Sequence, residues 1–265
     1  MSDIDGTLLT AFDPVVFARV ELDFEPDPWQ QQVLRSESKR MIFNCCRQSG
    51  KSTTAAIKAS HRALFYANQL VLILSPSLRQ SGEMFRKISA IEQMVKVKPK
   101  KVEDSKLFMA LDNGSRVISL PGKEGTVRGY SGVNLIIIDE DAQVDDDMYR
   151  AIRPMLAVSE GTLLLLSTPR GKRGHFFYEW HEGGDTWERV EVTANDCPRI
   201  NKQFLEEERR TLGERWYRQE YECSFEEMED GVMSYDAITA AITDDVEPLF
   251  SSPVSEDVRP LFERR

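Results

Sequence analysis

The sequence lacks the features that mark exported, membrane-spanning and zinc-binding proteins. It holds only four cysteines in 265 residues, with no CxxC spacing, which argues against a zinc site. No apolar run approaches the roughly 20 residues that a membrane helix requires. The first segment, MSDIDGTLLTAF, has neither the basic start nor the apolar stretch of a signal peptide. We therefore expect a soluble protein whose cysteines are reduced thiols in a cytosol.

The sequence also lacks the positive charge that is usual in proteins that bind nucleic acid. Its formal net charge is −10 at pH 7. Twelve acidic and three basic residues lie from Tyr221 to the C-terminus, a net of −9, so residues 1–220 carry about −1. Two local basic clusters remain, Lys96, Lys98, Lys100 and Lys101 in the first and Arg170, Lys172 and Arg173 in the second. Such a cluster can contact phosphates or be an ordinary solvated loop, and both interpretations stay open.

Short, fully apolar segments alternate with helical patterns through the middle of the chain. The apolar segments predict strands at 41–46, 71–76, 134–139 and 162–167, and the helical patterns cover 52–67 and 80–95. Two further strands, 106–111 and 116–120, flank Asp-Asn-Gly, a strong hairpin signal. Continuous apolar strands between helices predict a mostly parallel α/β sheet with helices on both faces.

The remaining segments define the expected domain boundaries. Residues 1–25 are predicted to be an acidic, loosely structured lead-in, and residues 236–265 an acidic linker or tail. Between them we expect one domain, 26–235. It includes a short helix broken at Pro154, a strand at 187–192 and a helix over 201–222.

The segment NCCRQSGKST, residues 44–53, has the context of a phosphate loop, because it follows a strand and opens a helix. Backbone N–H groups and the helix dipole favour phosphate there. Lys51 can reach the β- and γ-phosphates of ATP, and the Ser52 hydroxyl can ligate Mg²⁺. Asn44 stands where the first glycine is expected, and asparagine tolerates left-handed backbone. The predicted ATP-binding residues of the loop are Arg47, Gln48, Ser49, Gly50, Lys51, Ser52 and Thr53.

A second motif, LIIIDE at 135–140, ends a buried strand with two carboxylates. The carboxyl ends of strands in open α/β sheets are where ligands bind. Asp139 is predicted to hold Mg²⁺ through water, and Glu140 to orient or deprotonate an attacking water. The alternative is that the pair only begins an acidic turn after the strand and has no catalytic role, since Asp141 and Asp145–Asp147 follow.

Three weaker signals complete the predicted site. LLLLSTPRG, residues 163–171, ends a strand with Ser167 and Thr168, whose hydroxyls can sense the γ-phosphate. Gln30 can read the adenine edge with its amide, while Trp29 can pack on the base or in the core. Arg128 lies in a glycine-rich segment and can reach a phosphate in a neighbouring subunit, and Arg47 is a second candidate cation.

Together these motifs resemble the ATPase domain of the large terminase subunit of tailed bacteriophages, a motor that pumps DNA into a procapsid. The resemblance covers about 26–235. It rests on Trp29-Gln30, CCRQSGKST with its internal arginine, RGYSGVNLIIIDEDAQ, STPRG and RWYRQEYECSFEEMEDGVMSYDAI.

The resemblance implies a P-loop NTPase of the additional-strand, catalytic-glutamate (RecA-like) type that uses ATP and Mg²⁺. It implies that Gln30 reads adenine, that Glu140 is catalytic and that Ser167-Thr168 couples hydrolysis to movement. Arg128 matches a trans-acting arginine finger and Arg47 a loop arginine with a cis role, so the finger assignment stays open.

The resemblance also implies partners and a location. The partners are double-stranded DNA, the portal protein of the procapsid and the small terminase subunit, in the cytoplasm of the infected host cell. A homo-oligomeric ring is expected on assembly, and a monomer in isolation. Full terminase subunits continue into a nuclease domain, for which this chain has no room after the linker, so no nuclease activity is expected.

Two other functions compete with the motor. A helicase-like translocase shares the glutamine, the Asp-Glu pair and the Ser-Thr strand end, but it needs a second motor domain that does not fit in this chain. A nucleotide-gated scaffold without turnover is expected to lose Glu140 or Lys51, and both are present.

Overall fold

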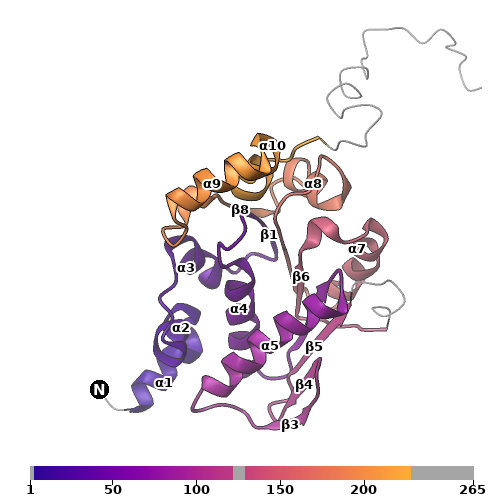
Figure 1. The fold of residues 1–265 in the computed structure, drawn as a ribbon. Helices are drawn as coiled ribbons and strands as arrows, with labels where there is room; N and C mark the ends of the chain where they lie inside the picture. The colour runs from indigo at the N-terminus through magenta and orange to yellow at the C-terminus, as the bar shows by residue number, and fades with distance from the viewer. Residues whose placement is uncertain (1–2, 122–128, 228–265) are drawn as a thin grey trace, which may run out of the picture. The chain divides into compact units, whose positions relative to one another are not determined.

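An eight-stranded sheet forms the centre of the computed structural model, which describes residues 3–121 and 129–227 (Figure 1). The strand order is β3-β4-β5-β2-β6-β7-β1-β8. The strands are β1 (Arg40–Cys45), β2 (Leu70–Ser75), β3 (Lys101–Asp104), β4 (Phe108–Leu111), β5 (Arg116–Pro121), β6 (Leu135–Asp139), β7 (Thr162–Ser167) and β8 (Glu188–Val192). The six strands from β5 to β8 in this order are parallel, and β3 and β4 are antiparallel additions. The predicted mostly parallel α/β fold is confirmed.

Side chains of the central strands alternate between two buried cores, one on each face of the sheet. Met41 and Phe43 belong to the first core, and Ile42 between them belongs to the second. Each core therefore needs its own layer of helices, which is why these strands are apolar without a polar face.

Helices cover both faces (Figure 1). The first core receives residues from α2 (Pro14–Leu22), α3 (Pro28–Arg35), α4 (Lys51–Phe65), α5 (Leu78–Met94), α9 (Lys202–Leu212) and α10 (Glu214–Tyr221). The second core receives residues from α7 (Asp146–Ile152), the 3₁₀ helix η2 (Arg153–Leu156) and α8 (Gly174–His181). The remaining described helices are α1 (Asp3–Phe12) and the 3₁₀ helices η1 (Asp141–Gln143) and η3 (Ala194–Asp196).

The predicted hairpin is present between β4 and β5. At its turn, Gly114 adopts φ +82°, which favours glycine, and the Asn113 side chain accepts a hydrogen bond from the Ser115 N–H at 2.9 Å. The predicted break at Pro154 is also confirmed, since α7 ends at Ile152 and η2 contains the proline.

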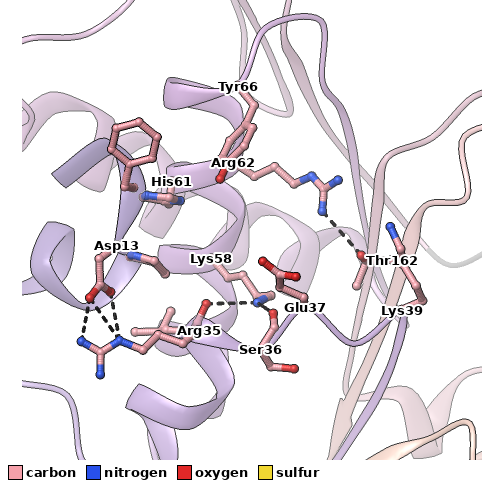
Figure 2. A pocket seen from close by; sticks show the side chains of 13 residues that line it. Asp13, Arg35, Ser36, Glu37, Lys39, Lys58, His61, Arg62, Tyr66 and Thr162 are labelled. Atoms are coloured by element: carbon pink, nitrogen blue, oxygen red, sulfur yellow. Dashed lines mark hydrogen bonds and ion pairs between the residues drawn. The ribbon is translucent and has the colours of Figure 1, made fainter. Parts of the chain in front are cut away.

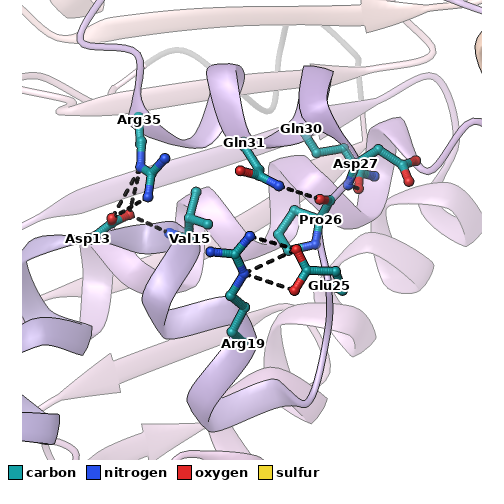
Figure 3. Close-up of polar contacts among 9 residues, drawn as sticks. All are labelled: Asp13, Val15, Arg19, Glu25, Pro26, Asp27, Gln30, Gln31 and Arg35. Carbon is teal, nitrogen blue, oxygen red and sulfur yellow. Dashed lines mark hydrogen bonds and ion pairs between the residues drawn. The ribbon is translucent and has the colours of Figure 1, made fainter.

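The predicted loose lead-in is wrong for residues 14–22, which form helix α2. Val15, Phe17 and Ala18 are fully buried in the first core. Asp13 caps the helix by accepting a hydrogen bond from the Val15 N–H at 2.8 Å, and Arg35 of α3 pairs with the same carboxylate at 2.6 Å (Figure 3). The acidic composition of residues 1–25 hid the helix, because most of those acidic residues lie outside it while Val15 and Phe17 are buried in the core.

Two boundaries also differ from the prediction. The predicted helix 201–222 is two helices, α9 and α10, separated at Gly213, whose φ of 80° and ψ of 160° do not continue a helix. The first of two structural units of the chain ends at Glu226. Residues 228–235, the rest of the predicted domain, lie outside the described residues.

The burial of α2 makes a stability prediction. Phe17 is fully buried and meets the rings of His61 and Phe65, each at 5.5 Å between centroids. Phe17→Ala is expected to lower the free energy of unfolding by about 3–5 kcal/mol in urea titrations, because it leaves a cavity. Val20→Ala on the same helix is the control, since Val20 is 61% exposed. Equal, small effects of the two substitutions would show that α2 is not part of the core.

Candidate nucleotide site

The carboxyl ends of three adjacent parallel strands form the centre of the candidate site. β7 lies between β1 and β6 and pairs with both. The phosphate loop leaves β1, the Asp139-Glu140 pair ends β6, and Ser167-Thr168 ends β7. The insertion of β7 between the other two strands is the additional-strand arrangement, so the predicted fold type is confirmed.

The phosphate loop turns through left-handed backbone at Gln48, with φ 61°, and at Gly50, with φ 95°. Helix α4 then begins at Lys51, so its first N–H groups face the turn. The φ of Gly50 favours glycine, and a Cβ there would lie 2.8 Å from the Gln30 amide nitrogen. The loop therefore lies close to the Gln30 side chain.

The expected role of Asn44 is wrong on two counts. Five positions before Gly50, the spacing of the first glycine, gives Cys45 and not Asn44. Asn44 is also not left-handed but lies within β1, paired with both neighbouring strands. Its buried side chain donates a hydrogen bond to the Cys223 carbonyl at 2.8 Å, so it fastens the strand to the segment after α10.

Lys51 brings two of the predicted motifs together. Its side chain is buried, and its Nζ donates a hydrogen bond to Thr168 Oγ1 at 3.2 Å. The same Nζ lies 3.8 Å from Glu140 Oε1. Ser167, in contrast, is fully buried and donates to the Thr168 carbonyl at 2.8 Å, so Thr168 is the hydroxyl of this pair that meets Lys51.

Ser52 and Asp139 form the second contact of the site. The Ser52 Oγ donates to the Asp139 carboxylate, at 3.2 and 3.4 Å from its two oxygens. Burial and, to a smaller extent, the neighbouring Glu140 raise the pKa of Asp139 to about 6, although Lys51 and Ser52 oppose the rise. A buried carboxylate that is this reluctant to ionise suits a nearby divalent cation, because the cation would stabilise its charged form.

A cavity of about 440 Å³ opens beside these residues. Glu140 lines it in a left-handed conformation, with φ 55° and ψ 42°. Three lining residues had no predicted role, Gln80 and Lys87 of α5 and Gln143 of the turn η1. Gln143 ends the RGYSGVNLIIIDEDAQ segment on which the family resemblance rests, whereas no sequence signal marked the other two.

Gln30 and Trp29 are neighbours in the sequence but make different kinds of contact. Gln30 is fully buried; its oxygen accepts the Asp27 N–H at 2.8 Å, and its amide nitrogen has no hydrogen-bond partner among the described residues (Figure 3). That unused donor beside Gly50 fits the prediction that Gln30 reads a base. Trp29 packs edge-on against Phe43 at 6.4 Å between centroids, which favours the core alternative for its ring.

Arg199 is a contact of the phosphate loop that the sequence analysis did not single out. It donates to the Ser49 carbonyl at 3.1 Å and pairs with Asp27 at 2.7 Å. It therefore ties the loop to the cap of the helix that carries Gln30, and only the fold brings it there from beyond β8.

Of the two candidate arginines, Arg47 belongs to the part of the chain that the structure describes. Arg128 lies outside the described residues. Arg47 lines the cavity, and its side-chain Nε pairs with the Glu220 carboxylate of α10. Its backbone N–H donates to the Glu220 carbonyl at 3.1 Å. Its two terminal nitrogens make no hydrogen bond within the described part of the chain.

A larger cavity, about 540 Å³, lies at the opposite ends of β1 and β7 (Figure 2). Two of its cations, Lys58 and Arg62, already serve the fold. Lys58 donates to the carbonyls of Val33, Leu34 and Ser36, and burial lowers its pKa to about 8. Arg62 donates to Thr162 at 3.5 Å. Since ligands of parallel sheets bind at the carboxyl ends of the strands, the smaller cavity is the candidate site.

The basic cluster at 96–101 is partly explained by the fold. Lys98 and Lys101 each pair with the buried carboxylate of Glu92 at 2.9 Å. These two lysines therefore neutralise a buried charge within the fold. Arg170 and Arg173 are exposed beyond the end of β7.

The fold and this site define a P-loop NTPase of the RecA-like type. The family described as "Terminase large subunit, T4likevirus-type, N-terminal" matches residues 42–240. The chain belongs to this family. The large terminase subunit of Escherichia phage T5 is 30% identical over 204 residues, which are 72% of this chain and 45% of that protein. The chain thus spans less than half the length of this relative.

Solved structures share the fold. A variant of the large terminase ATPase domain of Thermus phage P74-26 superposes with a TM-score of 0.72 at 21% identity, over 81% of this chain and all of that one. The large terminase of a thermophilic bacteriophage in complex with ADP gives a TM-score of 0.61 at 16% identity, over 76% of this chain and 54% of that one.

Two searches of the described residues gave negative results. Among residues 3–121 and 129–227, no helix is long and apolar enough to cross a membrane. The same residues contain no group of three or more His, Cys, Asp and Glu side chains that could hold a metal ion.

The raised pKa of Asp139 makes a prediction for the protein without nucleotide and Mg²⁺. A carboxyl whose pKa is higher in the folded state, here about 6, destabilises the fold as it ionises, so stability falls as pH rises from about 4 to about 6. Asp139→Asn is expected to raise the free energy of unfolding at pH 7 by roughly 1–3 kcal/mol and to flatten that pH dependence. Chemical denaturation at several pH values measures both. If Asp139→Asn were less stable than the unmodified chain at pH 7, the raised pKa of Asp139 would be contradicted.

Proposed function

We propose that this chain is the ATP-hydrolysing motor domain of a viral terminase that translocates double-stranded DNA into a procapsid. The observation that carries the proposal is the meeting of Lys51, Thr168 and Glu140 at adjacent strand ends, within 3.2 and 3.8 Å of the lysine nitrogen. Family membership supports the packaging motor over a helicase-like translocase.

The proposed chemistry assigns one task to each side chain. Lys51 and the N–H groups at the start of α4 bind the ATP phosphates. Glu140 orients the attacking water and accepts its proton. Thr168 responds when the γ-phosphate departs, a role supported by its hydrogen bond to Lys51. Gln30 offers its unused amide donor to adenine.

Ser52 and Asp139 would hold Mg²⁺ beside the phosphates. Their contact and the burial of the carboxylate fit this role. The ion would neutralise the charge that develops on the phosphate oxygens.

The stimulating cation is proposed to be an arginine. Arg47 lines the cavity, its two terminal nitrogens are unused by the described residues, and it can act within one chain. Arg128 is the candidate to act on a neighbouring subunit. Either would stabilise transition-state charge, a contribution of about 10³–10⁵ in rate in related phosphoryl-transfer enzymes.

The proposed partners follow from family membership. They are double-stranded DNA, the portal protein, the small terminase subunit and further copies of this chain in a ring, in the cytoplasm of the infected host. The structures of the thermophilic phage terminase with ADP and with ATP-γ-S concern that protein and support nucleotide binding here.

The first functional prediction concerns Glu140→Gln. Loss of the base is expected to reduce phosphate release from ATP at least about 100-fold while ATP binding persists, because Lys51 and Ser52 are unchanged. Asp147→Asn is the control, an exposed carboxylate in the same acidic run. Hydrolysis by the Gln variant at the unmodified rate would refute the assignment of the base.

The second functional prediction separates the two arginines. If Arg128 acts in trans, hydrolysis per chain rises with chain concentration, and Arg128→Ala abolishes the rise. If Arg47 acts alone, the rate per chain is constant and Arg47→Ala lowers it. Steady-state phosphate release over a range of chain concentrations measures both cases, and a rate that neither substitution lowers would contradict both.

A further inference from the structure

A buried histidine on α8 joins the residues that follow the Asp139-Glu140 pair. His175 Nε2 lies 2.9 Å from an oxygen of Asp141, and its Nδ1 lies 2.9 Å from an oxygen of Asp146. The His175 backbone N–H donates to the same Asp146 oxygen at 2.7 Å. The ring stacks on Tyr149, with centroids 4.3 Å apart and planes 7° from parallel. The imidazole is therefore fixed in position and in rotation.

Asp141 is the member of this group closest to the proposed chemistry. It follows Glu140 directly, begins η1 and is fully buried. Burial raises the pKa of Asp141, and His175 opposes the rise. Burial lowers the pKa of His175, but Asp141 and Asp146 outweigh it and hold it above its usual value. A histidine that donates from both nitrogens accounts for both contacts.

Glu140 needs such support because its backbone is left-handed, with φ 55° and ψ 42°. That conformation costs a non-glycine residue about 1–2 kcal/mol and persists where the surroundings enforce it. The turn itself contributes the Gln143 N–H to the Glu140 carbonyl and the Val144 N–H to the Asp141 carbonyl, both at 2.9 Å. The Asp141 side chain attaches this turn to α8, through His175.

We propose that His175 is a positioning residue for hydrolysis, which holds Glu140 at the phosphate cavity by fixing the Asp141 carboxylate. The inference rests on the proposed role of Glu140 as the base. This role for His175 also gives a function to Asp141 and Asp146, two members of the acidic run to which the sequence alone assigns none. α8 starts seven residues after Ser167, so the histidine links the segment after β7 to the turn after β6.

Two amide variants separate this role from a general contribution to folding. The Gln side chain in His175→Gln places an N–H near the Nε2 position and can reach Asp141. The shorter Asn in His175→Asn places one near Nδ1 and can reach only Asp146. Both remove the ring and its charge and keep an amide. They differ by one methylene group, and therefore in the carboxylate that the amide can reach.

The experiment is steady-state ATP hydrolysis of the whole chain with both variants, beside its affinity for ADP and its melting temperature. We expect His175→Asn to lower kcat about 10- to 100-fold with little change in KM, as for other residues that orient a reacting group, and His175→Gln to recover most of that loss. Equal kcat values for the two variants would overturn the proposal.

A double variant guards against a loss of folding from an unpaired buried charge. Asp141→Asn combined with His175→Phe removes the charge and keeps a ring on Tyr149, but breaks this link between turn and helix. It is expected to fold and to stay slow. Recovery of the unmodified kcat would show that His175 serves only as a counter-charge. If the unmodified chain itself hydrolyses no ATP, the proposed function fails before this inference is tested.

Discussion

The site depends on the contacts that the buried ammonium of Lys51 makes with Thr168 and Glu140. A lysine is rarely this buried without partners, and here they come from two other strand ends, Thr168 after β7 and Glu140 after β6. They meet because β1, β7 and β6 are parallel and adjacent, so that their carboxyl ends share one edge of the sheet. The apolar strands thus fix the polar site, since a change in their register would separate these three side chains.

Much of this arrangement is predictable from the sequence. Continuous apolar strands of five or six residues followed by Gly-Lys-Ser, Asp-Glu and Ser-Thr predict both the parallel sheet and the residues at its edge. Local rules suffice there, because strand, turn and helix signals agree with one another. The hairpin at Asn113-Gly114 and the break at Pro154 belong to the same class, in which one or two residues determine the backbone.

The parts that could not be predicted depend on contacts between distant segments. α2 lies within an acidic segment, residues 1–25, and only the burial of Phe17 shows that the helix belongs to the core. Arg199 and Glu220 reach the phosphate loop from more than 140 residues away in the sequence. No local pattern marks such a residue. The same is true of His175, whose two carboxylate partners lie more than 25 residues before it.

The most direct test of the account is a crystal structure of the Glu140→Gln variant with ATP and Mg²⁺. The account predicts the γ-phosphate at Lys51 Nζ in place of its bond to Thr168, the metal ion at Ser52 Oγ and near Asp139, and the substituted glutamine facing the γ-phosphate. Nucleotide bound in the larger cavity at the other end of the sheet, or a metal ion away from Ser52, would contradict it.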